Sequence, residues 1–152
     1  MPHHVFIVED HTLMREIVET YVEEQPALSV CGTASTGEDA LDLLPCGADL
    51  VLVDISLPGM SGIDLICTIR VRWPELPCLV CSGHDEAVYV ERALAAGARG
   101  YVAKGNPAEL TEGLQCILSG TDYLSPSLRE RVEARAAEAV DDGGRNARSN
   151  AA

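Results

Sequence analysis

The sequence predicts one α/β domain, built on a parallel sheet of five strands with helices on both faces. Five short apolar runs alternate with segments whose apolar residues recur every three or four positions, as in right-handed βαβ crossovers. The apolar stretch 50–53 is uninterrupted, which is typical of a strand buried on both faces. A chain of 152 residues with 47% hydrophobic residues is large enough to bury such a core.

The first part of the chain predicts three strand–helix units. The first helix has an apolar stripe over residues 13–22, and the second begins at a capping box, Ser35-x-x-Glu38, and runs through Leu44. The third has an isoleucine-rich stripe over 63–69 and ends before Pro74. The three strands are predicted over residues 4–8, 28–34 and 49–54.

The second part adds two units and a polar extension. Strands are predicted over 77–82 and 100–104, and the helix over 85–98 has Gly97 as its left-handed C-terminal cap. Asn106 caps the last helix, which has proline at its first position and stops near Gly120. We expect a domain over residues 1–121, a linker helix over 122–140 and a disordered tail over 141–152.

The distribution of charge argues against a nucleic-acid reader. The net charge is −13, and all of it falls on residues 1–128, because residues 129–152 hold equal numbers of acidic and basic side chains. Such an acidic body repels phosphates. No apolar run is long enough to span a membrane, and the N-terminus does not resemble a secretory signal. We therefore expect a cytoplasmic protein that binds neither nucleic acid nor membranes.

The six cysteines suggest reduced thiols. Only "CLVC", Cys78 to Cys81, has the C-x-x-C spacing, and it lies in a predicted strand. Positions i and i+3 of a strand point to opposite faces, so the two sulfurs are not expected to form a redox or zinc pair.

Polar residues end four of the five predicted strands. Glu9 and Asp10 follow the first strand, Asp54 ends the third, Ser82 the fourth and Lys104 the fifth. In a flavodoxin-like sheet of order 2-1-3-4-5, these ends are neighbours at the edge where ligands bind, while the second strand lies at the side.

This set of residues is suited to phosphoryl transfer. Three clustered carboxylates repel one another, and a hard cation such as Mg²⁺ (or Mn²⁺) would offset that repulsion. With Lys104 alongside, Asp54 stays ionised and can attack phosphorus in line to give an aspartyl phosphate. The Ser82 hydroxyl can donate a hydrogen bond to one phosphoryl oxygen.

The chain resembles a response-regulator receiver domain of two-component signalling, from about Val5 to Ser119. The motifs that carry the resemblance are "VEDH", "VLVDISLPGMSG", "CSGH" and "GYVAK", in the right order and spacing. The resemblance implies that Asp54 accepts a phosphoryl group from a sensor histidine kinase. It also implies that Glu9, Asp10 and the Ser56 backbone carbonyl hold Mg²⁺, and that Ser82 and Tyr101 form the switch pair.

Within that family the sequence is most similar to the NarL/FixJ (LuxR-type) receivers. "EDHTLMRE" resembles their "DDHPLVRE", and "GTDYLSPSL" resembles the segment that leads into their linker. Three features depart from the pattern: Thr12 replaces a proline, Gly83 follows the switch serine, and no helix-turn-helix follows. The expected output is control of transcription through a DNA-binding domain outside this chain, with a homodimer formed on phosphorylation.

Some roles stay open at this level. Ser56, Gly83 and His84 could modulate access to the phosphorylation site or the lifetime of the phosphoryl group, although His84 could equally be a solvated loop residue. We expect a stoichiometric phosphoacceptor with self-dephosphorylation and no turnover activity. One alternative is a stand-alone or phosphorylation-independent interaction module. A haloacid-dehalogenase-like phosphatase is less favoured, because it needs a second acid at position 56.

Overall fold

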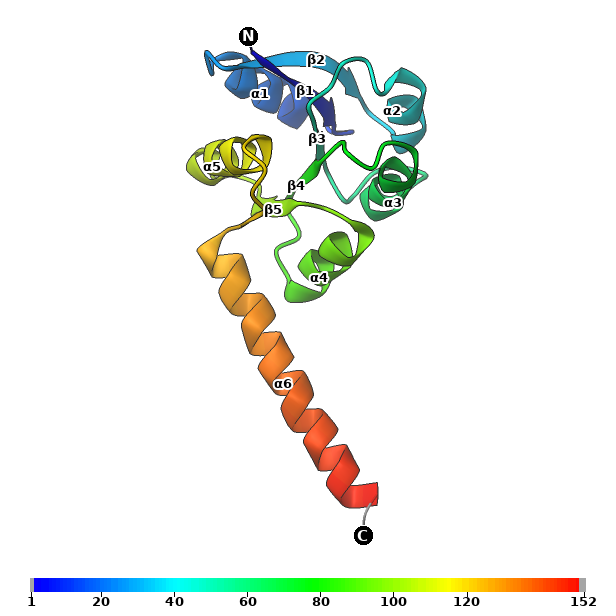
Figure 1. The fold of residues 1–152 in the computed structure, drawn as a ribbon, viewed down its shortest axis with the longest axis vertical. Helices are drawn as coiled ribbons and strands as arrows, with labels where there is room; N and C mark the ends of the chain where they lie inside the picture. The colour runs from blue at the N-terminus through cyan, green and yellow to red at the C-terminus, as the bar shows by residue number, and fades with distance from the viewer. Residues whose placement is uncertain (1, 151–152) are drawn as a thin grey trace.

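The structure, a computed structural model, describes the backbone of residues 2–150 and the side chains of residues 2–138. Strands and helices alternate along the chain (Figure 1). The strands are β1 (His3–Val8), β2 (Leu28–Ala34), β3 (Leu50–Val53), β4 (Cys78–Ser82), β5 (Gly100–Ala103) and β6 (Tyr123–Leu124). The helices are α1 (Thr12–Glu23), α2 (Gly37–Leu43), α3 (Gly62–Arg72), α4 (Ala87–Ala96), α5 (Pro107–Leu118) and α6 (Pro126–Asn150).

The sheet has the order β2-β1-β3-β4-β5-β6, and all its strand pairs are parallel. The predicted order 2-1-3-4-5 of the first five strands is confirmed. The sixth strand was not predicted, and the linker helix begins at Pro126, inside the segment 122–140 where it is expected. Two residues are too few to produce a periodic pattern, and β6 exists because Tyr123 and Leu124 pair with Gly100 and Tyr101.

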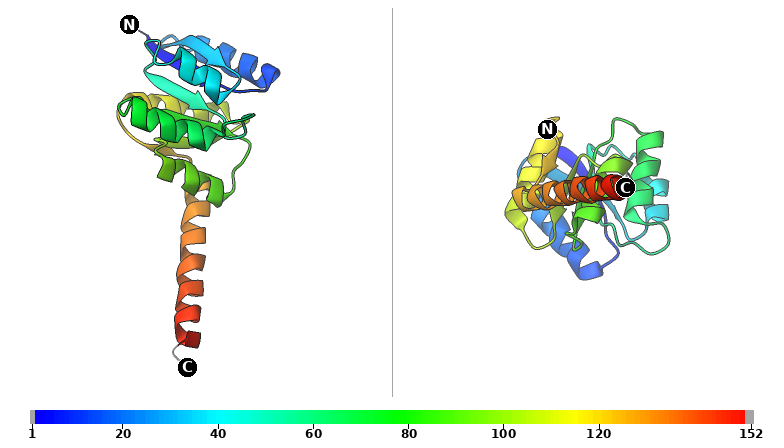
Figure 2. Two further views of the ribbon diagram at one scale, coloured as in Figure 1. Left: turned by 90° about the vertical axis from the view of Figure 1, so that its right-hand side faces the viewer. Right: turned by 90° about the horizontal axis from the view of Figure 1, so that it is seen from below.

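Two apolar layers cover the faces of the sheet (Figure 1 and Figure 2). One layer joins α1 and α5 to one face, and the other joins α2, α3, α4 and the start of α6 to the opposite face. All four residues of β3 are buried, as its uninterrupted apolar run predicts. Cys78 and Cys81 belong to different layers, so the two sulfurs of "CLVC" do lie on opposite faces.

Caps fix where several of the helices begin and end. Gly97 ends α4 with a φ of 118°, and Asn106 accepts a hydrogen bond from the Glu109 N–H, both as predicted. The predicted cap of α2 is wrong by one residue, because the Thr36 hydroxyl, not that of Ser35, accepts the Asp39 N–H. Both positions fit the capping pattern, and only Thr36 places its oxygen at the helix end.

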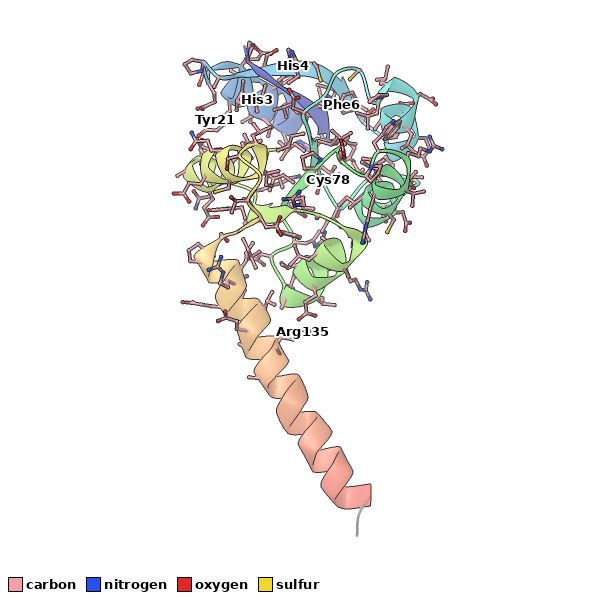
Figure 3. All side chains as sticks on the ribbon, in the orientation of Figure 1. His3, His4, Phe6, Tyr21, Cys78 and Arg135 are labelled. Atoms are coloured by element: carbon pink, nitrogen blue, oxygen red, sulfur yellow. The ribbon has the colours of Figure 1, made fainter. Side chains whose placement is uncertain are left out.

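Helix α6 packs on α4 at its start and then projects from the domain (Figure 2). Leu128 is fully buried, and the Nε of Arg135 lies 2.9 Å from the carboxylate of Glu91 in α4. Figure 3 shows Arg135 on α6. The helix continues to Asn150, whereas the sequence predicts a helix end near residue 140 and a disordered tail. A helix already nucleated by packing extends by one hydrogen bond per residue, even through a polar sequence.

None of the described helices combines the length and hydropathy that crossing a membrane requires.

Candidate functional site

Four adjacent strands bring polar side chains to one edge of the sheet. Glu9 and Asp10 follow β1, Asp54 follows β3, Ser82 ends β4 and Lys104 follows β5. Because these strands are parallel neighbours, their carboxyl ends meet at the same edge. Hydrogen bonds from the Asp54 N–H to the Val8 carbonyl (3.1 Å) and from the Lys104 N–H to the Ser82 carbonyl (2.9 Å) extend the strand pairing into the site.

Lys104 links two of the acids. Its Nζ lies 2.7 Å from Glu9 Oε1 and 2.9 Å from Asp54 Oδ2. The Lys104 side chain is 22% exposed, whereas both carboxylates are almost completely buried. Burial lowers the pKa of Lys104, but the hydrogen bonds and charges of Glu9 and Asp54 outweigh it and leave that pKa above its usual value. The ammonium is therefore fixed in the charged form between the two acids.

The three acids are close enough to share one cation. Glu9, Asp10 and Asp54 each offer an oxygen, and these oxygens lie within 4.8 Å of one another. Among the described residues, none donates a hydrogen bond to the buried Glu9 Oε2. Burial, reinforced by the neighbouring Asp54, raises the pKa of Glu9 to about 7. A buried carboxylate oxygen without a donor is the kind of ligand that a hard cation satisfies.

Asp54 is held in its ionised form. Burial raises its pKa, but the Glu9 carboxyl and the Lys104 ammonium, together with the Ser56 backbone N–H, hold the pKa below its usual value. The Ser56 N–H donates to Asp54 Oδ1 over 3.3 Å. The two neighbouring acids thus have opposite tendencies, because Glu9 keeps its proton at mildly acidic pH while Asp54 does not.

The loop after Asp54 approaches the strand closely at Gly62. A Cβ atom at Gly62 would lie 2.1 Å from the Asp54 carbonyl oxygen and 2.7 Å from Ile55 Cα, so only glycine fits there. The Gly62 N–H donates to the Ile55 carbonyl over 2.9 Å. This contact fixes the turn "PGMSG" that carries the chain from Asp54 into α3.

Ser82 and Tyr101 are both fully buried next to the loop between β4 and α4. Ser82 Oγ accepts the His84 N–H over 3.1 Å, and the Tyr101 hydroxyl donates to the His84 carbonyl. Burial is the main cause that raises the pKa of Tyr101 to about 12. The backbone of His84 therefore receives contacts from both members of the predicted switch pair. In the described hydrogen bonds, Ser82 is joined to this loop and not to Asp54.

His84 also reaches across to the loop that follows Asp54. Its Nε2 lies 2.6 Å from Ser56 Oγ, and its ring packs on Tyr89 with 4.6 Å between centroids. A Cβ at Gly83 would meet no atom within 4 Å, so the chain is open at that position. Sequence reasoning named Ser56, Gly83 and His84 separately but missed the contact between Ser56 and His84. No pattern signals it, because 28 residues separate the two side chains.

Helix α6 also contacts the loop between β4 and α4, and this contact was not predicted from the sequence. Arg131 donates to the Asp85 carbonyl oxygen over 3.1 Å and lies 2.7 Å from the Asp85 carboxylate. Asp85 follows His84 directly, so α6 touches the segment that contacts Ser82 and Tyr101. The only sequence signal is the mixed charge of "RERVEAR", which is more often a solvated face.

Comparison with known proteins places these features in a family. The sequence model of one protein family, described as the response regulator receiver domain, matches residues 5–115 of this chain. The chain is 32% identical over 130 residues to the transcriptional regulatory protein DegU of Brevibacillus brevis, covering 84% of this chain and 55% of that protein. It is 30% identical over 130 residues to the response regulator UvrY of Escherichia coli, covering 84% and 60%. The chain thus spans somewhat over half the length of these relatives.

Solved structures agree with this match. A LuxR-family two-component response regulator from an Aurantimonas species superposes with a TM-score of 0.86 at 29% identity, covering 90% of this chain and 99% of that one. The isolated receiver domain of RcsB from Salmonella enterica, at 23% identity and a TM-score of 0.80, supports the fold alone. With the family match over most of the chain, this protein belongs to the response regulator receiver domains of the NarL/FixJ (LuxR) type.

Proposed function

We propose that the chain is the phosphoacceptor of a two-component response regulator, and that Asp54 takes the phosphoryl group from a sensor histidine kinase. The observation that carries this proposal is the Asp54 carboxylate itself, buried at the end of the central strand and 2.9 Å from Lys104 Nζ. An ionised carboxylate at a water-poor sheet edge, paired with one cation, is a nucleophile placed where a phosphoryl group can approach.

The acidic cluster fits Mg²⁺. Its donors are all carboxylate oxygens, and Glu9 Oε2 is buried without a donor in the described part of the chain. We infer that Glu9, Asp10 and Asp54 hold the ion, with the Ser56 backbone carbonyl as a further ligand. A bound Mg²⁺ neutralises charge on phosphoryl oxygens.

The remaining residues of the site have separate tasks. Asp54 supplies the oxygen that attacks phosphorus, and Lys104 stays protonated and balances the charge of the acyl phosphate. Ser82 Oγ accepts from the His84 N–H in the structure, and a hydroxyl also carries one proton to donate, so it can turn and donate to a phosphoryl oxygen. Ser56 contacts Asp54 through its backbone N–H and His84 through its hydroxyl, so these two residues are placed to modulate how water reaches Asp54.

The switch runs through the loop between β4 and α4. Rotation of Ser82 toward a phosphoryl group removes its bond to the His84 N–H, and Tyr101 follows through its bond to the His84 carbonyl. The aromatic ring is already buried in this structure. Phosphorylation therefore shifts a population between states that differ in these contacts. The output is a homodimer that controls transcription through a DNA-binding domain outside this chain.

The test is phosphorylation by acetyl phosphate, with and without Mg²⁺, followed by intact-protein mass measurement. We expect one phosphoryl group per chain, dependent on Mg²⁺ and absent from Asp54→Asn. Asp42→Asn, an exposed acid on α2, is the matched control and should be phosphorylated normally.

Three outcomes separate the alternatives. Label on Asp54→Asn at the same site would overturn the assignment of Asp54. No label under any condition, in a protein that still binds its partners, would favour a phosphorylation-independent interaction module. Steady release of phosphate from p-nitrophenyl phosphate would favour a hydrolase over a stoichiometric phosphoacceptor.

A further inference from the structure

Two thiols that are distant in the sequence meet on the surface beside the edge strand. Cys31 lies half-buried in β2, and Cys46 is exposed in the loop between α2 and β3. Their Sγ atoms are 3.7 Å apart. Among the described residues, this is the one pair of cysteines in contact, because Cys78 and Cys81 are buried in different layers.

The loop that carries Cys46 has an unusual backbone. Cys46 has a φ of 34°, which makes it the one non-glycine residue in the described chain with a positive φ. L-residues avoid this region, so the surrounding loop holds Cys46 there at some cost. This conformation presents an exposed cysteine beside a second sulfur, although a glycine would satisfy the backbone more easily.

The two sulfurs are already in contact, at somewhat more than bonding distance. An S–S bond is about 2.05 Å long, so the sulfurs must approach by about 1.7 Å. Cys46 is exposed in a loop outside the sheet, so only this loop has to adjust, whereas Cys31 lies in a strand paired with β1. Rotation of the Cys46 side chain with a small loop shift therefore closes the distance without disturbing the sheet.

We propose that Cys31 and Cys46 form a thiol–disulfide exchange site, which reacts with a small disulfide of the glutathione class and closes an internal disulfide. This site is separate from the acidic cluster and does not depend on the phosphoacceptor role of Asp54.

The reaction has two balanced steps. The Cys46 thiol gives its proton to water, and its thiolate attacks one sulfur of the small disulfide, releasing one thiolate and leaving a mixed disulfide on Cys46. Cys31 then loses its proton and attacks Cys46 Sγ, which expels the second thiolate. The two protein thiols are oxidised, and the small disulfide is reduced to two thiols.

The order of attack follows from the surroundings. Burial and the adjacent Cys46 raise the pKa of the Cys31 thiol to about 12, so Cys31 is a poor first nucleophile, whereas Cys46 is open to solvent. Once Cys46 is in a mixed disulfide it carries no charge, and its contribution to the raised pKa of Cys31 disappears. The second step is also intramolecular over a short distance, which compensates for the small thiolate fraction.

The experiment uses the full chain with Cys67→Ser. This substitution removes the exposed thiol that would otherwise lie on the same proteolytic fragment as Cys46. The folded protein is incubated with oxidised glutathione, then denatured in the presence of excess N-ethylmaleimide, which blocks every remaining thiol including the buried ones, and cleaved after glutamate. Cleavage at Glu24, Glu38 and Glu75 separates Cys31 (residues 25–38) from Cys46 (residues 39–75). We expect the two fragments to remain joined with the loss of two hydrogens, and a dithiol reductant to separate them.

Two variants in this background test the order of attack. In Cys31→Ser, Cys46 should keep one glutathione, because no second thiol can displace it. In Cys46→Ser, Cys31 should be recovered as the maleimide adduct. Cys116, on the separate fragment 113–130, is the internal control and should enter no protein disulfide.

Thermal unfolding tests whether the bond belongs to the folded state. A link across this span should raise the unfolding midpoint by roughly 5–10 °C over the reduced protein, because it restricts the unfolded chain. The proposal is overturned if Cys46 stops at the glutathione adduct with Cys31 present, if Cys31 pairs with Cys116, or if the oxidised protein has an equal or lower midpoint.

Discussion

At the residue scale, the balance of charge in the site depends on Lys104, the one lysine in the sequence. Its ammonium contacts Glu9 and Asp54 at hydrogen-bonding distance, and neither acid is exposed enough for water to replace it. A buried pair of like charges without a cation is unstable, so the same residue that assists chemistry also stabilises the fold.

Lys104→Met should therefore lower the free energy of unfolding in a pH-dependent way. Without Mg²⁺, we expect a loss of about 1–3 kcal/mol at pH 8, because without the ammonium the two buried acids either repel each other or Glu9 must take up a proton from an alkaline solution. At pH 5 the loss should be smaller, because Glu9 then carries a proton. Urea unfolding followed by the fluorescence of Trp73, the single tryptophan, measures it.

Arg99→Met is the matched control for this prediction. Arg99 pairs with Asp122 on the surface, where both side chains are largely exposed. Such pairs contribute about 0–1 kcal/mol, so the loss should be small and nearly independent of pH. Equal losses in the two variants at both pH values would show that Lys104 does not balance a buried pair.

The raised pKa of Glu9 gives a second prediction at this scale. The folded protein holds the Glu9 proton up to about pH 7, whereas the unfolded chain releases it near pH 4.5. Between these values the folded state binds more protons, so raising the pH removes stability. The side chain in Glu9→Gln has no proton to release, so the stability of this variant lacks the loss that Glu9 causes as the pH rises.

Urea unfolding with a chelator, from pH 5 to pH 8, compares the wild type with Glu9→Gln. Relative to the variant, the wild type should lose on the order of 2–3 kcal/mol as the pH rises through this range. Mg²⁺ at pH 8 should restore stability to the wild type, because it replaces the lost proton. A constant difference between the two proteins across the range would show that Glu9 titrates near its ordinary pKa.

At the scale of the element, the turn between β3 and α3 positions Asp54 through backbone contacts. Gly62 lies against the Asp54 carbonyl, and Ser61 caps the helix that follows by accepting the Asp64 N–H. The strand end, the turn and the first turn of α3 therefore form one packed unit, in which Asp54 cannot shift without the helix.

Gly62→Ala should disrupt this unit. Its Cβ would lie 2.1 Å from the Asp54 carbonyl oxygen, and backbone atoms cannot rotate away as a side chain can. We expect a loss of about 3 kcal/mol or more in the free energy of unfolding, and weaker phosphorylation of the remaining folded protein.

Gly83→Ala provides the control on the neighbouring loop. At Gly83 the added Cβ meets nothing within 4 Å, and its φ is not positive, so stability should change by less than about 0.5 kcal/mol. Similar losses at both glycines would mean that the turn after Asp54 relaxes and does not fix the strand end.

At the scale of the whole molecule, the sequence predicts the sheet well because apolar runs and their polar ends are local signals. Glu9, Asp54 and Lys104 each follow directly on a strand and Ser82 ends one, and parallel pairing then brings them to one edge without further information. Contacts between loops have no such signal. The bond between Ser56 and His84 depends on two rotamers, and the contact of Arg131 with Asp85 depends on where α6 lies.

The position of α6 also changes which residues belong to the domain. The sequence predicts a linker helix over residues 122–140. In the structure, however, Leu128 is 1% exposed and packs in the same apolar layer as Tyr101 and Val90. Leu128→Ala should cost about 2–4 kcal/mol of unfolding free energy, as for a core leucine. Leu43→Ala, at a leucine of α2 that is 52% exposed, should cost less than about 1 kcal/mol.

Shortening the chain tests the same conclusion without changing a side chain. The described contacts of α6 with the domain lie between Leu128 and Arg135, so a chain that ends at residue 138 should unfold at the same urea concentration as the full chain. A chain that ends at residue 125 exposes the Tyr101 layer and loses the contact of Arg131 with Asp85, so it should unfold at a lower concentration. If both shortened chains matched the full one, α6 would be a linker that the domain does not need, and the loop at His84 would have to be held by Ser82 and Tyr101 alone.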